Sequence, residues 1–587
     1  MDVAGLVVGV ASLAVTVPDW LKGYYVVEKV FRGSFGPEAK LFLAQLKMQC
    51  ATLESWSEAW DWDKGCAGIY WADWNFRKNE DLVVAYRTLI TERLDELRKK
   101  SCENLSVAET ANPHESAVAS IGNIAPPMQS NIERLEEGVQ GVHRNATTTL
   151  QSAGWANNEE YFNKVLKNIK SMIDDIYKLL PPPNHDTVAA HVCNSQLASS
   201  SIAELNAIVS AAEDGPMLQG LAHLKLKMLQ LTQSAKDNIA EVMLRDRMLR
   251  ETESTTDERT NRCLGTFRQA DTTKDDVLVE WKLADSSRIP PGHANTSFHD
   301  MVKSRFQSLA SLLKESPKVP DIRILECLGV VMRDLTDDEI HYGLVSRAPS
   351  TRYKTLKDIL SGPPDDMALD DWFAIAHSIA RAVLCIHLSG WLHKGIRSEN
   401  ILYFLDNEGK ISYNKPYIAG FEYSRQALKY THTESVCDDM EANLYRHIEV
   451  QGVPSDSATA NNKVPFSSKH EIFSVGVILL ELGLQRSAID IYKDAKRSGG
   501  CPERHSATAF SDWIVEKELP KLGRLRGKGY LEATKVCLKL DFGNSTQAVS
   551  SEVVDGELLQ NEAEVIQKSF WRDVVRPISG GVGGLSE

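Results

Sequence analysis

The chain has 587 residues, of which 43% are hydrophobic and 25% are charged, a composition typical of a globular protein with roughly two to four domains. The formal net charge of −14 argues against a nucleic-acid partner, because neutralising phosphates requires a basic surface. The ten cysteines include no C-x-x-C pair and no zinc-ligand spacing, which predicts reduced thiols in a cytoplasmic protein.

Residues 3–17 form an almost uninterrupted apolar run, shorter than the roughly 20 residues that a helix needs to span a bilayer. Asp2 stands where a secretory signal would carry a basic residue, so we expect the run to be retained. A helix that is apolar all round must be buried or inserted. The sequence predicts burial at rest and conditional membrane insertion, with a purely structural central helix as the alternative. The predicted membrane-active residues are Val3, Gly5, Leu6, Val7, Gly9, Val10 and Leu13, of which Gly5 and Gly9 form a G-x-x-x-G pattern.

Residues 1–215 are expected to form an all-α bundle. Apolar residues recur at three- and four-residue spacing in the segments 38–60, 81–100 and 158–180. Three prolines at 181–183 end the last of these helices, and a polar stretch follows them. A helical connector, or brace, is predicted for residues 216–262.

From residue 263 the pattern changes to that of an α+β domain. The sequence predicts strands at 277–282, 322–331 and 340–347 and a helix at 298–314. An amphipathic helix is expected at 369–387, with acidic residues in its first turn. Further predictions are strands at 401–404 and before residue 418, and a buried helix at 471–481.

The segment between the helix at 369–387 and the strand at 401–404 resembles a protein-kinase catalytic loop. It reads His393-Lys394-Gly395-Ile396-Arg397-Ser398-Glu399-Asn400, with Gly395 in the position of the catalytic Asp. Downstream, Ala419-Gly420-Phe421 replaces the Asp-Phe-Gly triplet that holds magnesium. Because both carboxylates are missing, the sequence predicts a pseudokinase without phosphoryl transfer and without a metal.

The other parts of a nucleotide site are also incomplete. No G-x-G-x-x-G lid lies between Arg262 and Val277, where Gly265 stands alone. Lys282 ends a predicted strand and either contacts a nucleotide phosphate or is a surface lysine. The cofactor prediction is therefore none, beyond weak ATP binding through Lys282. Asn400 and His393 are expected to hold the loop together rather than to bind metal or act as a base.

An active atypical kinase is the alternative from another class. It would require Asp406, Glu399 or Glu422 to take the missing role. The triplet Asp541-Phe542-Gly543 matches a metal-binding motif, but it follows the helix expected at 471–481 and stands too late in the chain. A third interpretation is a scaffold with neither catalysis nor membrane activity.

Two parts of the chain resemble known families. Residues 1–11 and the helical region to about 210 resemble the fungal HeLo domain, also called the prion-inhibition and propagation domain. The loop at 393–404 together with residues 419–425 resembles the degenerate kinase-like domain often fused to it. The layout of bundle, brace and pseudokinase is similar to that of the mixed-lineage kinase domain-like executioner of animal necroptosis. The glycine-rich end, residues 581–587, is no Gly/Asn-rich amyloid-forming tail.

These resemblances imply a multidomain signalling or cell-death effector of the heterokaryon-incompatibility kind. The expected domains are the HeLo-like bundle 1–215, the connector 216–262, the kinase-like domain 263–580 and the tail 581–587. The implied partners are membrane lipid on activation, a second copy bound through the N-terminal bundle, and an upstream activating protein of unknown identity. The expected location is the cytoplasm, with conditional recruitment to membrane.

Overall fold

The computed structural model divides the chain into two compact units. The first comprises Met1–Gln196 and Ser200–Gln219, and the second Leu197–Ser199 and Gly220–Glu587. The division falls inside helix α9 (Pro216–Gln233), close to the expected boundary at 215. The structure describes residues 37–59, 79–110, 158–179, 182–197, 201–212, 215–233, 242–252, 261–268, 274–285, 295–315, 319–334, 339–362, 367–421, 424–426, 440–451, 466–499, 507–542 and 565–583.

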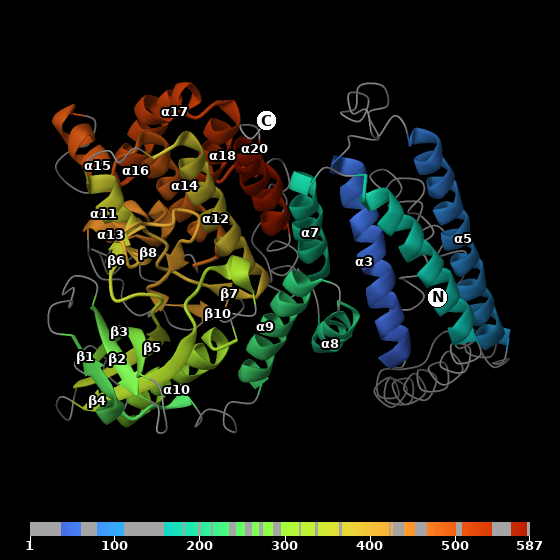
Figure 1. Ribbon diagram of the computed structural model, residues 1–587, viewed down its shortest axis with the longest axis horizontal. Helices are drawn as coiled ribbons and strands as arrows, with labels where there is room; N and C mark the ends of the chain where they lie inside the picture. The colour runs from blue at the N-terminus through green and yellow to red at the C-terminus, as the bar shows by residue number, and fades with distance from the viewer. Residues whose placement is uncertain are drawn as a thin grey trace, which may run out of the picture. The chain divides into compact units, whose positions relative to one another are not determined.

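The first unit is helical over the residues that can be described, as predicted (Figure 1). The Trp56 indole donates a hydrogen bond to the carbonyl of Ile176 at 2.9 Å, and the rings of Phe42 and Phe162 lie 5.6 Å apart. These contacts join α3 to the helix at 158–177 around one apolar core. The helices are α3 (Pro37–Ala59), α5 (Glu80–Thr110), the segment 158–177, α7 (Pro182–Leu197), α8 (Ile202–Ala211) and the start of α9.

Pro182 and Pro183 lie in the first turn of a helix, although a loop was expected after the prolines. The helix at 158–177 ends ahead of them, and α7 begins at Pro182. Proline lacks an amide hydrogen, and the first amides of a helix have no intrahelical acceptor, so proline is well tolerated in the first turn. The polar stretch that follows, up to Leu197, is therefore helical.

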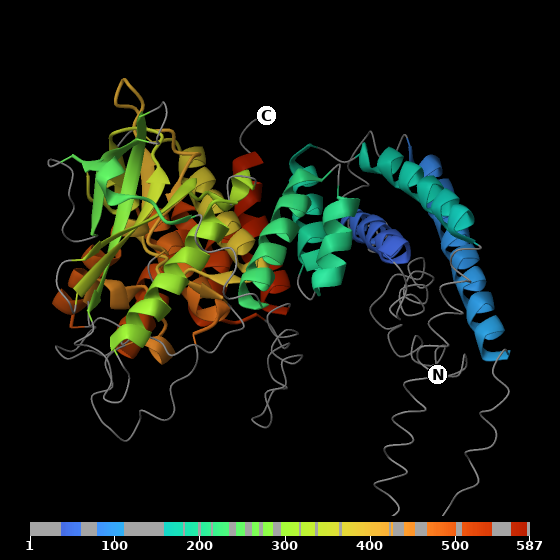
Figure 2. The same cartoon turned by 90° about the horizontal axis from the view of Figure 1, so that it is seen from below.

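A five-stranded antiparallel sheet with the order β1-β2-β3-β5-β4 forms one part of the second unit, the sheet subdomain (residues 242–347). Helix α10 (Asn295–Leu313) packs along the sheet, where the rings of Phe306 and Tyr342 stack 5.5 Å apart (Figure 2). The strands are β1 (Leu249–Glu251), β2 (Arg262–Arg268), β3 (Lys274–Asp285), β4 (Cys327–Asp334) and β5 (Glu339–Arg347).

Two predictions about this part need correction. The connector expected to be helical as far as residue 262 contains β1, which pairs with β2 from Leu249 to Glu251. A three-residue strand is too short for its alternation to stand out in the sequence. The strand expected at 322–331 begins at Cys327, because Pro320–Ile322 forms a 3-10 turn.

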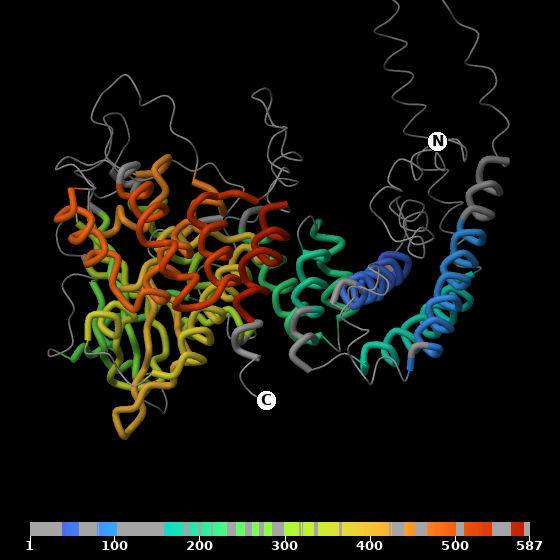
Figure 3. Tube along the Cα trace, turned by 90° about the horizontal axis from the view of Figure 1, so that it is seen from above, coloured from blue at the N-terminus to red at the C-terminus, as the bar shows by residue number. Residues whose placement is uncertain are grey.

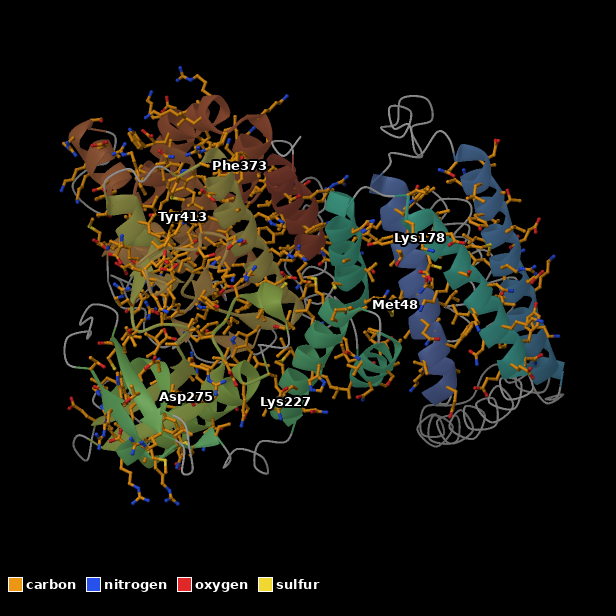
Figure 4. All side chains as sticks on the ribbon, in the orientation of Figure 1. Met48, Lys178, Lys227, Asp275, Phe373 and Tyr413 are labelled. Atoms are coloured by element: carbon orange, nitrogen blue, oxygen red, sulfur yellow. The ribbon has the colours of Figure 1, made fainter. Side chains whose placement is uncertain are left out.

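The rest of the second unit is the helical subdomain (residues 353–583), in which the later helices gather on one side (Figure 3). Phe373 of α12 lies within this subdomain (Figure 4). Its ring meets the ring of Tyr530 edge-on at 5.4 Å. The helices are α11 (Leu356–Ser361), α12 (Leu369–Leu388), α13 (Met440–Leu444), α14 (Ser468–Leu484), α15 (Ala488–Arg497), α16 (Ala507–Trp513), α17 (Leu519–Leu525), α18 (Lys528–Lys539) and α20 (Arg576–Gly583). The last of these includes residues 581–583 of the expected tail.

Short strands connect these helices. Strands β6, β8 and β9 form one antiparallel sheet and β7 and β10 another, as expected for the strands at 401–404 and before 418. Their bounds are β6 (Tyr353–Thr355), β7 (Trp391–Leu392), β8 (Ile401–Phe404), β9 (Tyr417–Ile418) and β10 (Arg425–Gln426).

Helices α12 and α14 form the core of the helical subdomain. Among the described residues, α12 is the one single helix long and apolar enough to cross a membrane, and it is mostly buried within the unit. α14 and α15 pass the same test only as a pair bent by 80°. The core helix of a globular protein is also long, apolar and buried, so α12 alone gives little evidence of a membrane span.

The carboxyl group of Glu481 is fully buried near the end of α14. Its Oε1 accepts hydrogen bonds from the Tyr445 hydroxyl at 2.6 Å and from the Ala488 amide at 2.7 Å. Oε2 has no hydrogen-bond partner. Burial raises the pKa of this carboxyl from 4.5 to about 7, because removal from water penalises the charged form.

This burial predicts a pH-dependent contribution to stability. Between pH 4.5 and 7 the folded chain holds a proton on Glu481 that the unfolded chain has released, so stability falls as pH rises through this window. Relative to Glu481→Gln, the free energy of unfolding should fall by roughly 3 kcal/mol across it and stay level above it.

Urea unfolding of both proteins at a series of pH values checks this expectation. Glu516→Gln, a change at an exposed carboxylate of the same subdomain, serves as the matched control and should show no such window. A constant difference between wild type and Glu481→Gln from pH 4.5 to 8 would contradict the assignment.

Candidate functional site

The candidate site lies where the sheet subdomain meets the loop between α12 and β8. Glu471, in the first turn of α14, anchors this loop through its carboxylate. One carboxylate oxygen accepts from the amide of Lys394, and the other lies 2.7 Å from Nε2 of His387. Lys394 takes a left-handed backbone conformation, with φ of 67°, which these contacts stabilise.

His393 is a structural residue of this loop. Its ring is fully buried and meets the ring of Phe421 edge-on at 4.3 Å. Nδ1 accepts from the amide of Gly395 at 3.1 Å, and the His393 carbonyl accepts from the Ser424 hydroxyl at 2.9 Å. These contacts agree with the predicted role in holding the loop together.

Gly395 lies in a crowded position, where any side chain would press against its neighbours. A Cβ atom there would lie 3.0 Å from the carbonyl oxygen of Gly420 and 3.1 Å from Nδ2 of Asn400, closer than most Cβ contacts in proteins. Gly420 has φ of +89°, and a Cβ on it would lie 2.2 Å from the same Nδ2. Both glycines therefore permit the close approach of backbone to the Asn400 amide.

The side chain of Asn400 is fully engaged within the protein. Its Nδ2 donates to the carbonyl of Gly395 at 2.6 Å, and its Oδ1 accepts from the Arg262 guanidinium. The Asn400 carbonyl accepts from the amide of Ala419 at 2.9 Å. Oδ1, the atom through which Asn400 would bind a metal, is thus bonded to a protein group.

An ion pair between Arg262 and Glu280 occupies the centre of the site. Nε of Arg262 lies 2.9 Å from Oε1 of Glu280, and both side chains are more than nine-tenths buried. The same Oε1 accepts from the amide of Gly420 at 2.6 Å, while Arg262 also donates to the carbonyl of Glu399 at 2.9 Å. Two strands of the sheet are thereby bonded to both degenerate motifs of the helical subdomain.

Apolar side chains close the space next to this ion pair. Lys282 lies two residues after Glu280 on the same face of β3 and is buried. The sheet and the helical subdomain meet in one apolar cluster consisting of Leu264, Leu278, Leu325, Ala348, Leu402 and Ala419. Every member is less than a tenth exposed, so side chains of the protein fill this part of the site.

Sequence reasoning missed Arg262 and Glu280. Glu280 precedes Lys282 by two positions, and this spacing on a strand was the available signal. The strand order also changes which segment stands in the position expected for the glycine-rich lid. Because β1 precedes β2, the connection in the lid's place spans residues 252–261, whose sequence contains no glycine. Gly265 instead allows β1 to approach, since a Cβ there would lie 2.6 Å from the Arg250 carbonyl.

The remaining predicted residues lie elsewhere or outside the described part of the chain. Asp541 and Phe542 follow α18. The predicted membrane-active residues between Val3 and Leu13 and the candidate acid Glu422 belong to segments that the structure does not describe.

The buried ion pair predicts a large and coupled effect of mutation. Arg262→Ala or Glu280→Ala leaves one buried charge without its partner, which should lower the free energy of unfolding by about 3–5 kcal/mol. The double variant leaves no such charge and should lose clearly less than the sum of the two. Urea unfolding measures all three.

Lys535→Ala removes one partner of an exposed ion pair with Glu532 and serves as the control, with an expected cost below about 1 kcal/mol. Additive effects of the two buried substitutions, or a cost of Arg262→Ala no larger than that of the control, would show that the pair does not hold the site together.

The comparison with known families supports one of the two resemblances. The HeLo family model, described as prion-inhibition and propagation, matches residues 5–208. No curated protein matches the chain. The match covers most of the first unit and leaves the second unit unassigned. Residues 5–208 therefore form a HeLo domain, which is followed by a mixed α/β region with antiparallel sheets.

Proposed function

We propose that this protein is a regulated cell-death effector whose HeLo domain targets membranes under the control of a catalytically dead kinase-like unit. The observation that carries the proposal is the Arg262–Glu280 pair, which bonds to Asn400 and Gly420 where a kinase would hold metal and phosphate. A HeLo domain matched at residues 5–208 supports the membrane-targeting half.

The arrangement of the second unit supports a kinase-like fold. A five-stranded antiparallel sheet with one packed helix precedes a mainly helical subdomain. The loop with the degenerate motif leads into β8, and Glu471 at the start of α14 accepts from that loop's backbone. The proposed kinase-like unit would thus keep the architecture of the catalytic loop while lacking its acids.

Two of the three candidate substitute acids, Asp406 and Glu399, are engaged in other contacts. Oδ1 of Asp406 accepts from the amides of Glu408 and Lys410 at 2.9 and 2.8 Å in a tight turn. Glu399 forms an ion pair with Lys357 at 2.5 Å. These contacts favour the pseudokinase over an atypical active kinase.

The connection between the two units gives the second a route to act on the first. Helix α9 begins in the first unit and continues into the second, where Gly390 approaches Met228 closely. A Cβ on Gly390 would lie 2.4 Å from Cε of Met228, so this contact depends on the glycine. We propose that the second unit holds the HeLo domain inactive through this continuous helix until an activating partner binds.

The catalytic half of the proposal predicts no magnesium-dependent phosphoryl transfer. The variant Gly395→Asp/Ala419→Asp restores a carboxylate at both positions. It should remain inactive, because a side chain at 395 would press against Asn400 and a carboxylate at 419 would be buried in an apolar cluster. Transfer of labelled γ-phosphate from ATP to the protein or to a generic substrate is the measurement, with Lys282→Ala as the control. Phosphate incorporation by the wild type that Lys282→Ala abolishes would favour the active-kinase alternative.

The membrane half predicts that lipid binding depends on the apolar N-terminal run. Gly9→Asp introduces a charge that bilayer insertion must desolvate at about 2.5–3.5 kcal/mol, which corresponds to a roughly hundredfold weaker partition. Gly9→Ala keeps the position small and apolar and is the matched control. Liposome flotation and dye leakage, on the full chain and on residues 1–219, are the measurements.

We expect residues 1–219 to bind and permeabilise vesicles more strongly than the full chain, and deletion of residues 1–17 to abolish both activities. Equal lipid binding by the fragment with and without residues 1–17 would mean that this segment is only structural. The scaffold interpretation would then be preferred.

A further inference from the structure

Three side chains with metal-ligating atoms converge beside the start of α14. His447 is the residue before a 3-10 turn at Ile448–Val450, Glu449 lies within that turn, and His470 lies in the first turn of α14. Nε2 of His470 lies 3.0 Å from Oε2 of Glu449, and Nδ1 of His447 lies 3.6 Å from the same oxygen. All three ligand atoms lie within 4.8 Å of one another. No other group of three such residues is this close in the part of the chain that the structure describes.

These separations suit a tetrahedral zinc site. Zinc binds histidine nitrogen and carboxylate oxygen at about 2.1 Å, which places neighbouring ligand atoms of a tetrahedron about 3.4 Å apart. Both distances to Glu449 lie within a few tenths of an ångström of that value. Two histidines and one glutamate also form a known zinc ligand set that leaves the fourth position open to water.

The ring protons can rearrange to suit a metal. Nδ1 of His470 accepts from the Ser467 amide at 2.8 Å, which places the ring proton on Nε2, toward Glu449. A metal on Nε2 moves this proton to Nδ1, where the Ser467 hydroxyl oxygen, 3.2 Å away, can accept it. The cost is the hydrogen bond from the Ser467 amide to His470 and the one that Nδ1 of His447 accepts from the Glu449 amide at 3.4 Å.

The ammonium group of Lys469 would compete with a metal ion for the Glu449 carboxylate. Lys469 places its Nζ 3.3 Å from Oε2 of Glu449, so it shares the carboxylate that a metal would use. The Lys469 side chain is one-third exposed and can turn toward water.

We propose that His447, Glu449 and His470 form a zinc site that ties the 3-10 turn to the N-terminus of α14. Glu449 and His470 are 21 positions apart in the sequence, so the metal would close a loop between them. Since α14 carries Glu471, which holds the loop at His393, zinc would also stabilise the base of the candidate site.

Zinc binding to the full-length protein tests the proposal. The protein is stripped with a chelator and titrated with ZnCl₂ against a chromophoric chelator. Glu449→Gln and His447→Gln are the test variants, since both side chains reach the surface and their replacement should leave the fold intact. Glu339→Gln and His341→Gln, with the same residue types and spacing on β5, are matched controls.

The wild type and both controls should bind one more zinc equivalent than the test variants, or bind it at least roughly tenfold more tightly. Lys469→Gln should strengthen binding, because it removes the competing cation. Bound Co²⁺ should show the visible absorption of a tetrahedral nitrogen and oxygen site, without the near-ultraviolet band of thiolate ligands. Equal zinc stoichiometry and affinity in wild type, Glu449→Gln and His447→Gln would overturn the proposal.

Discussion

The buried ion pair between Arg262 and Glu280 is the interaction on which the arrangement of the second unit depends. Removal of either side chain would leave the other charge buried without its partner, in a medium of low dielectric constant, and this would destabilise the folded state. Because Arg262 also bonds to Asn400 and the Glu399 carbonyl, and Glu280 to the Gly420 amide, the pair connects the sheet to both degenerate motifs. Separation of the two subdomains would break all of these bonds at once.

The absence of carboxylates at positions 395 and 419 is consistent with the close packing around these two positions. Gly395 and Gly420 both lie against the Asn400 amide, where a Cβ on Gly420 would clash with Nδ2 at 2.2 Å and a Cβ on Gly395 would crowd it at 3.1 Å. Ala419 belongs to the apolar cluster between the subdomains, where a carboxylate would be buried without a partner. Two contacts maintain the conformation of the loop. The Glu471 carboxylate accepts from the Lys394 amide, and the ring of His393 packs against that of Phe421. These contacts make the site a structural joint between the two subdomains.

The sequence predicted the elements with strong periodicity and missed the contacts between distant residues. The helix at 369–387 and the strand ending near Lys282 carry patterns long enough to identify, and the structure confirms both. Arg262 and Asn400 are 138 positions apart, and no local pattern links them. β1 is too short to show a period. The cluster of His447, Glu449 and His470 matches no short zinc motif, because Glu449 and His470 are 21 positions apart in the sequence.

Hydrogen exchange at the segments 393–400 and 418–421, in the presence and absence of Mg-ATP, tests the closed site most directly. The amides of Gly395, Ala419 and Gly420 are bonded within the protein, so they should exchange slowly and at the same rate with and without nucleotide. Mg-ATP-dependent protection of these amides, lost on chelation of magnesium, would show that the site still admits a nucleotide and its metal. That result would contradict the account of a joint formed by Arg262 and Glu280.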